Sequence, residues 1–218
     1  MSQIFRPSSN TVAKVSIVGG VFALGILAVL GWLFINSPYM TMVGIAREQP
    51  VPFSHKHHVS ELGLDCRYCH TSVEESSFAG IPPTKTCMTC HSQVWTEAPV
   101  LQPVRDSYKT GTPLQWERVN NLADYVYFNH SIHVAKGVGC STCHGQVDQM
   151  TTVSKANTLY MSWCLACHRA PEKYIRPKSE VFNMDWQPPA DQLAQGRKLV
   201  DKYNIQVAQL TDCSVCHR

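Results

Sequence analysis

The chain has 218 residues, and its 19 basic and 16 acidic side chains leave a net charge of +3. So small a charge, without any basic run, excludes a typical nucleic-acid-binding protein. The length permits one ordinary domain, but 13 prolines and long polar stretches argue against extensive regular secondary structure.

The first predicted element is a membrane-spanning helix over residues 15–36. No charge interrupts the 21 residues from Val15 to Ile35, and at about 1.5 Å per residue they span roughly 30 Å, the thickness of a bilayer's hydrocarbon core. The alternative is a cleaved signal peptide, but its apolar core is shorter, roughly 7–15 residues, and ends at a small-residue cleavage site. The segment Asn36–Tyr39 offers no such site, so we expect an uncleaved anchor.

The residues beside this helix predict its orientation. Residues 1–14 contain Arg6 and Lys14 and no acid, and basic flanks prefer the cytoplasmic side. Everything after the anchor is then expected on the periplasmic side of a bacterial inner membrane, beginning with a linker over 37–50. Small residues four apart on the helix also permit close packing against other membrane helices. They are Ser16, Gly19, Gly20 and Ala23.

Five copies of Cys-x-x-Cys-His follow, and they contain every cysteine of the chain. This spacing is the attachment signature of c-type haem: two thiols one helical turn apart add to one porphyrin, and the next residue places an imidazole under the iron. We therefore expect five covalently bound haem c groups. The predicted attachment residues are Cys66, Cys69, Cys87, Cys90, Cys140, Cys143, Cys164, Cys167, Cys213 and Cys216, and the predicted proximal iron ligands are His70, His91, His144, His168 and His217.

Two other uses of cysteine explain this pattern less well. Disulfides between residues three apart would close very small loops, and they would not require a histidine after each pair. Structural zinc sites use Cys-x-x-Cys pairs two at a time. Five pairs would leave one over, and zinc needs no fused histidine.

The other five histidines occur in two similar segments. FSHKHH at 53–58 and FNHSIH at 128–133 both fit Phe-x-His-x-x-His, and each precedes a haem motif by a similar distance. We therefore predict an internal duplication of about 75 residues. One two-haem unit and its linker occupy 51–125, a second two-haem unit occupies 126–172, and a C-terminal segment over 173–218 carries the fifth haem.

Histidines three apart on a helix share a face but sit about one turn apart, so two imidazoles can serve two neighbouring irons. The arrangement resembles the class III cytochromes, of the tetrahaem c3 and trihaem c7 types. In them the first histidine of such a pair ligates the next haem in sequence, and the second reaches another haem. The resemblance implies His55 as distal ligand of the first haem and His130 of the third, with His58 and His133 ligating two others.

The fifth haem then lacks a histidine as distal ligand. His57 is expected to point away from its neighbours, toward a propionate or solvent. A methionine is the other option, and we prefer Met150 or Met161, which flank the loop between the third and fourth motifs, over Met184. A His/Met haem has a higher potential than its bis-His neighbours, which suits an exit site for electrons.

After the anchor and linker, about 170 residues must hold five haems, so the cofactors are expected to supply much of the core. We expect short helices that carry the motifs, joined by irregular loops. The predicted fold is thus a mostly irregular multihaem cytochrome c with c3/c7-like duplicated haem-binding units, plus one N-terminal transmembrane helix.

Together with the anchor, four segments resemble a more particular family, the membrane-anchored pentahaem cytochrome c subunit of alternative complex III. They are FSHKHHVSELGLDCRYCH at 53–70, IPPTKTCMTCHSQVW at 81–95, YFNHSIHVAKGVGCSTCHG at 127–145 and MSWCLACHRAPE at 161–172. The resemblance implies an electron-transfer subunit of a quinol:electron-acceptor oxidoreductase. Its implied partners are a polytopic quinol-binding membrane subunit, an iron–sulfur subunit, and a monohaem cytochrome c or terminal oxidase that accepts the electrons.

Three other functions compete with an electron relay. Anchored quinol dehydrogenases that feed periplasmic nitrate or nitrite reductases also have one helix and several haems. They typically carry a methionine two residues beyond a motif histidine, which no motif here does. A multihaem reductase needs an open coordination position and convergent acidic or cationic groups, for which no signature appears. A haem sensor has no use for five cofactors. We therefore expect no catalytic residue, and no enzyme activity by this chain alone.

Overall fold

The computed structural model describes residues 4–217, and the chain divides after Val43 into two compact units. The first unit contains α1 (Ser8–Ile35) and the one-turn helix α2 (Pro38–Thr41). The second unit begins at Gly44 and contains all five haem motifs.

Helix α1 is long and apolar enough to cross a membrane. It has 28 residues, and none of them is buried within the protein. A helix that is apolar on all sides is stable where its surroundings are apolar too. It begins at Ser8 rather than at residue 15, because Pro7 starts the helix and no glycine or proline interrupts the polar turns that follow. It ends at Ile35, shortly before Pro38.

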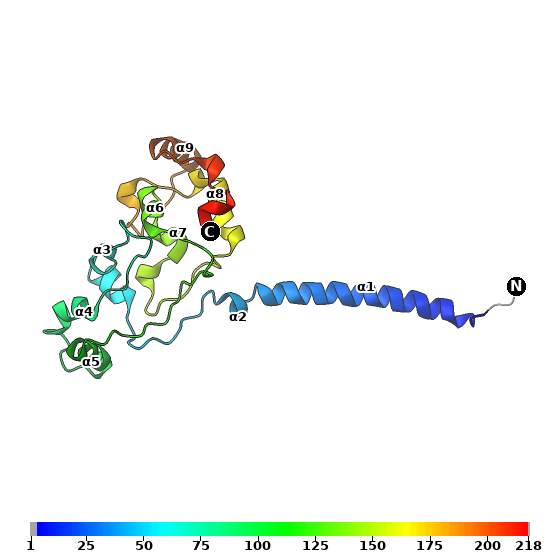
Figure 1. Ribbon diagram of the computed structural model, residues 1–218, viewed down its shortest axis with the longest axis horizontal. Helices are drawn as coiled ribbons and strands as arrows, with labels where there is room; N and C mark the ends of the chain where they lie inside the picture. Colours follow the sequence, from blue (N-terminus) through cyan, green and yellow to red (C-terminus); the bar gives the residue numbers. More distant parts are fainter. Residues whose placement is uncertain (1–3, 218) are drawn as a thin grey trace. The chain divides into compact units, whose positions relative to one another are not determined.

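The second unit consists of short helical segments joined by irregular loops (Figure 1). Among its residues 44–217, strand pairing is limited to isolated bridges. This confirms the predicted helix-rich, mostly irregular fold with one long apolar helix. In chain order the segments are η1 (Lys56–Glu61), α3 (Cys66–Cys69), α4 (Thr84–His91), η2 (Pro99–Leu101), α5 (Gln102–Thr110), α6 (His130–Ala135), α7 (Cys140–His144), η3 (Val147–Gln149), α8 (Met161–Arg169), η4 (Pro171–Lys173), η5 (Lys178–Glu180), α9 (Gln192–Lys202), η6 (Val207–Gln209) and α10 (Cys213–Cys216).

Every haem motif lies in a short helix, so its two cysteines share one face. Local sequence fixes where these helices start and stop. The Asp65 carboxylate caps α3 by accepting a hydrogen bond from the Arg67 N–H at 2.8 Å. Pro83 precedes α4, and Gly145, at a φ of +63°, ends α7 in a conformation that favours glycine.

The apolar core is small for a chain of this length. A domain of about 150 residues normally buries about two thirds of its unfolded surface, yet few apolar side chains are buried here. This matches the expectation that bound cofactors complete the core. Among the described residues, the buried apolar side chains are Val51, Val73, Leu101, Val104, Ile175, Val181 and Met184.

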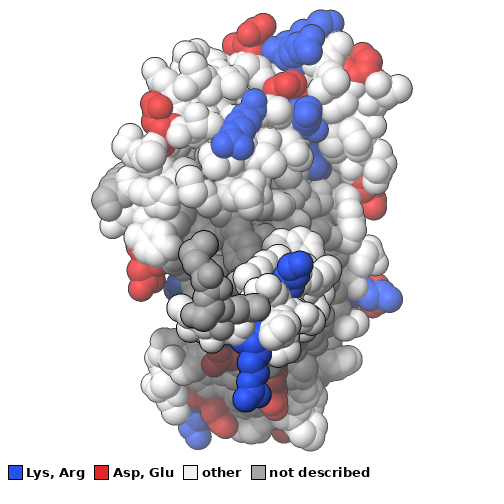
Figure 2. All heavy atoms as spheres, turned by 90° about the vertical axis from the view of Figure 1, so that its right-hand side faces the viewer, with Lys and Arg blue, Asp and Glu red and all other residues white. Residues whose placement is uncertain are grey.

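Close contacts join the C-terminal segment to the residues after the fourth motif. Gly196 of α9 is buried against the Glu172 carbonyl of η4, where a Cβ atom would collide. Gln192 donates hydrogen bonds to the carbonyls of Glu172, at 3.0 Å, and Ile175, at 2.9 Å. On the face in Figure 2, charged side chains of both signs are interspersed, which agrees with the small net charge.

Candidate haem sites

Four of the histidines outside the motifs face four of the motif histidines, one to one. The distances between ring centroids are 6.5 Å for His55 and His70, 6.3 Å for His58 and His91, 6.5 Å for His130 and His144, and 6.2 Å for His133 and His168. The second histidine of each segment thus faces the second motif of its own half of the duplication.

These distances fit two axial ligands of one metal ion. Metal–nitrogen bonds of about 2 Å on each side, plus roughly 1.1 Å from each nitrogen to its ring centre, separate two axial imidazole centroids by about 6.3 Å. Direct stacking or hydrogen bonding would not hold four separate pairs so uniformly at this spacing. The donor set therefore fits iron held between two imidazoles at each pair.

The motif histidines are oriented through their Nδ1 atoms. Nδ1 of His70 donates to the Gly80 carbonyl at 2.7 Å, and Nδ1 of His168 donates to the Leu210 carbonyl at 2.8 Å. His91 and His217 make the same kind of bond to other carbonyls. Because a carbonyl only accepts, the proton sits on Nδ1, and the Nε2 lone pair is left free to bind a metal.

His144 is the exception among the motif histidines. The Asn120 side-chain nitrogen lies 3.1 Å from its Nδ1. With the amide turned over, the Asn120 oxygen accepts the same proton.

The facing histidines are held in the same way. Nδ1 donates to a carbonyl in His58 (Ser54, 2.8 Å), His130 (Ser77, 2.9 Å) and His133 (Asn129, 2.6 Å). His55 differs, because its Nδ1 is buried and has no hydrogen-bond partner among the described residues.

Burial keeps several of these rings in the neutral form that binds metal. Burial lowers the pKa of His55 to about 4, and the neighbouring His70, His58 and His144 lower it further. Burial, followed by His130 and His70, also lowers the pKa of His144 to about 4. The pKa of His133 is lowered chiefly by burial.

A phenylalanine organises each Phe-x-His-x-x-His segment. The Phe53 ring meets the edge of His55 at 4.9 Å and stacks on His58 at 4.4 Å. Phe128 repeats the arrangement in the second half, edge-on to the first histidine at 4.8 Å and stacked on the second at 4.5 Å. The repeated phenylalanine in the sequence therefore has a physical role, because it sets the angle between two imidazoles that face different motifs.

None of the ten cysteines forms a disulfide. Among residues 4–217, no three His, Cys, Asp or Glu side chains converge as a compact metal site. Neither the disulfide nor the zinc alternative is therefore supported. Burial raises the pKa of Cys140 to about 11, of Cys143 to about 12 and of Cys167 to about 11.

The first motif contacts the second and lies near the third. The Tyr68 hydroxyl lies 2.9 Å from Thr89 Oγ1, which joins the first two motifs. The Cys140 thiol of the third motif is close enough to Cys66 of the first for charge on Cys66 to raise its pKa.

The third motif also lies near the fourth, and the fourth near the fifth. Asn157, in the loop before the fourth motif, donates to the Cys143 carbonyl at 2.9 Å. Cys167 and Cys143 are close enough for charge on Cys167 to raise the Cys143 pKa, and Cys216 acts on Cys164 in the same way. Neighbouring motifs thus follow the order second, first, third, fourth, fifth.

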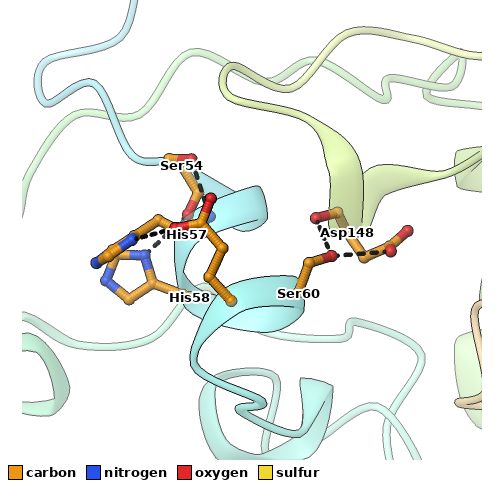
Figure 3. Close-up of polar contacts among 6 residues, drawn as sticks. Ser54, His57, His58, Ser60 and Asp148 are labelled. Carbon is orange, nitrogen blue, oxygen red and sulfur yellow. Dashed lines mark hydrogen bonds and ion pairs between the residues drawn. The ribbon is translucent and has the colours of Figure 1, made fainter.

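Ser60 and Asp148 join the two halves beside the first site (Figure 3). Ser60 of η1 donates to the carbonyl of Asp148 at 2.9 Å and lies 3.1 Å from its Oδ2, while His57 and His58 lie on the other side of the segment. Asp148 is buried, and Gln149 donates to its Oδ2 at 2.7 Å. The sequence alone did not single out Asp148, because no motif contains it.

The His57 ring contacts side chains of this chain, among them the edge of the His58 ring at 5.4 Å. Its Nδ1 lies 2.8 Å from Glu61 Oε2, and its ring stacks on Trp95 at 6.3 Å. These contacts account for His57 without a role as iron ligand.

The fifth motif differs from the other four. Among the described residues, no second imidazole faces His217, whose ring lies 5.7 Å from that of Tyr125. Met150 lies beside the third motif, near Gly145, and its carbonyl accepts from Lys56 N–H. Met161 is exposed at the start of α8, three residues before Cys164, whose thiol is near Cys216 of the fifth motif.

Paired imidazoles, cysteines on short helices and a sparse core define a multihaem cytochrome c. Residues 51–105 and 126–218 match the family described as cytochrome c7 and related cytochrome c. The chain belongs to this family, and it therefore carries covalently bound c-type haem and serves electron transport.

A curated relative adds a biological setting. The chain is 38% identical over 128 residues to the menaquinone reductase, multiheme cytochrome c subunit, of Nitratidesulfovibrio vulgaris (strain Hildenborough). The similar region is 58% of this chain and 56% of that protein, so the match spans little more than half of the relative's length.

Proposed function

We propose that this chain carries five haems and relays electrons for a quinone-linked membrane complex without itself reacting with quinone. Each covalently bound haem supplies a one-electron couple. The observation that carries the proposal is the pairing of imidazoles at four of the five motifs, which lie near one another in the fold.

The chain's own residues would do the following. Each Cys-x-x-Cys pair holds one haem, and the histidine after it binds the iron. The facing histidines His55, His58, His130 and His133 complete the first, second, third and fourth sites in that order. Two axial imidazoles leave no open position for a substrate, which favours a relay over a reductase.

For the fifth site we propose Met161 rather than Met150 as the distal ligand. Met161 is on the helix whose Cys164 lies near the fifth motif, whereas Met150 lies against the third motif and η1. The thioether is soft and flexible enough to reach an iron from an exposed helix start.

The spatial order of the motifs gives the order of transfer, from the second site through the first, third and fourth to the fifth, or the reverse. We propose residues 51–125 and 126–172 as the two duplicated units and 173–218 as the fifth-haem segment. The α1 helix would anchor the chain in the bacterial inner membrane, with residues 1–14 cytoplasmic and the haem unit periplasmic.

Two membrane complexes are candidates for the setting. The resemblance to the pentahaem subunit of alternative complex III favours electrons flowing from quinol to a periplasmic cytochrome c or a terminal oxidase. Its further partners would be a polytopic quinol-binding subunit and an iron–sulfur subunit. The curated relative is named a menaquinone reductase subunit, which favours flow toward the quinone. We propose the first, because four segments of this chain and its anchor carry that resemblance.

The test uses the complex purified from native membranes and the isolated full-length chain. We expect a quinol analogue to reduce the haems rapidly in the complex, with block by an inhibitor of the partner's quinol site, but slowly in the isolated chain. Rapid saturable reduction of the isolated chain would overturn the relay and favour an anchored quinol dehydrogenase. Oxidation of pre-reduced haems by menaquinone, with no reduction by quinol, would instead support the menaquinone-reducing direction.

A further inference from the structure

Arg176 is a buried cation that reaches the third haem motif from another part of the chain. Only 4% of its surface is exposed. Its Nη2 donates to Ser141 Oγ at 3.1 Å and to Thr142 Oγ1 at 3.4 Å, the two residues between the motif's cysteines. The guanidinium also lies over the Trp186 ring, 4.2 Å from its centroid.

The sequence makes room for this side chain at two glycines. A Cβ atom on Gly139, directly before Cys140, would collide with the Arg176 guanidinium. Gly137 has a φ of +80°, and its carbonyl accepts from the Arg176 N–H at 2.8 Å. The backbone at Gly137 and Gly139 therefore allows Arg176 to approach the third motif.

The charge of Arg176 is not compensated by the protein. No carboxylate oxygen among residues 4–217 lies within 4.0 Å of it, and its buried Nε has no hydrogen-bond partner there. Glu180, the acid whose charge reaches Arg176, accepts a hydrogen bond from Asn183 instead. Burial is the main influence on the Arg176 pKa, and it lowers that pKa.

Arg67 of the first motif provides a comparison within the same fold. It is exposed, and its guanidinium pairs with Asp65 at 2.8 Å and with Glu74 at 3.9 Å. The charge of Arg67 is therefore balanced by carboxylates and screened by solvent. The charge of Arg176 is neither paired with a carboxylate of the described residues nor exposed to solvent.

A purely structural role does not require this charge. A neutral polar side chain could donate to Ser141 and Thr142 without the cost of burying an unpaired cation. A buried positive charge does act on a redox centre, because reduction adds an electron and the low local dielectric leaves the attraction largely unscreened. The Arg176 guanidinium lies against the helix that carries Cys140, so the affected centre is the third one.

We propose that Arg176 is a positioning residue that raises the reduction potential of the haem held by Cys140 and Cys143. The inference rests on the proposed haem at this motif. In the proposed order of transfer this is the middle site. Arg176 would make its haem a stronger electron acceptor than the same haem would be without the charge.

The experiment compares Arg176→Met and Arg176→Lys in the full-length haem-loaded chain by potentiometric titration followed by absorption and electron paramagnetic resonance. A His130→Ala background would give the third haem a separate high-spin signal. We expect Arg176→Met to shift that haem to lower potential, Arg176→Lys to stay near the parent, and the control Arg67→Met to have a much smaller effect.

Mass spectrometry separates failure of the inference from failure of the proposed function. A parent chain without haem on Cys140 and Cys143 would refute the haem assignment itself. With the haem present, an unchanged potential in Arg176→Met would overturn the role of Arg176. An equal fall in Arg176→Lys would overturn it too, because the effect would then come from packing and not from charge. If Arg176→Met fails to fold, Arg176→Gln gives the same comparison with Arg176→Lys.

Discussion

Replacing His133 by alanine tests the pairing that the sequence left open. The sequence pattern implied only that the second histidine of each segment serves another haem. The structure places His133 opposite His168, with ring centroids 6.2 Å apart. If these two rings are axial ligands of one iron, His133→Ala converts the fourth haem, and no other, to the high-spin form.

The size of the effect follows from the count of motifs. One site among five changes, so about one fifth of the low-spin haem signal should be replaced by high-spin signal. Removal of the Nδ1 bond to the Asn129 carbonyl, 2.6 Å long, should also cost about 1 kcal/mol of folding free energy. Absorption and electron paramagnetic resonance measure the first quantity, and denaturant unfolding measures the second.

Triple variants identify which haem has changed. When Cys164 and Cys167 are also replaced by alanine, the fourth haem is absent, and adding His133→Ala should then produce no high-spin signal. When Cys140 and Cys143 are replaced instead, the signal should persist. A high-spin signal that disappears only with the third motif would refute the pairing. The matched control is His57→Ala, which removes an imidazole from outside the pairs and should leave every haem low-spin.

Three further predictions use the same protein. The mass of the native chain should exceed the 24.4 kDa polypeptide by five haems of about 0.6 kDa each, and a smaller excess would contradict the count. Met161→Ala should make one haem high-spin while Met150→Ala should not, by absorption spectroscopy; the reverse result would move the fifth ligand to Met150. Asp148→Ala should lower the unfolding free energy by about 1 kcal/mol, because Ser60 and Gln149 each lose a hydrogen bond to its carboxylate. An unchanged denaturation midpoint would show that this joint between the halves does not stabilise the fold.

The fold class and the four facing histidines could be predicted because they belong to local, repeated patterns. Cys-x-x-Cys-His places three groups within one helical turn, and the phenylalanine before each histidine pair contacts both rings within its own segment. Such short-range geometry is set by helix periodicity alone. The small apolar core could also be predicted, because five haem-binding motifs leave few residues for ordinary packing.

The remaining features depend on contacts between distant parts of the chain. Arg176 follows no motif, and only the fold brings it to Ser141, 35 residues earlier. The stacking of His57 on Trp95 likewise joins η1 to the turn after α4, and their approach depends on the first and second motifs being neighbours. A methionine that serves as distal ligand has no sequence signature, because any methionine whose thioether can reach the iron could serve. The backbone carbonyls that orient the imidazoles cannot be identified from the sequence, because every residue has one.

Hydrogen bonds join the two predicted units, residues 51–125 and 126–172, in both directions. The His130 ring of the second half is oriented by the Ser77 carbonyl of the first half. In return, the Lys56 N–H of the first half donates to the Met150 carbonyl of the second, and Ser60 donates to Asp148. These contacts surround the first and third motifs, whereas the second and fourth lie farther along each half. The second half therefore relies on the first to orient His130, and the first half is attached to the second through Lys56 and Ser60. In the proposed relay, electrons would pass between the halves from the first site to the third, beside these contacts. A substitution that weakens the contacts should therefore slow electron transfer between the halves before it slows transfer within either half.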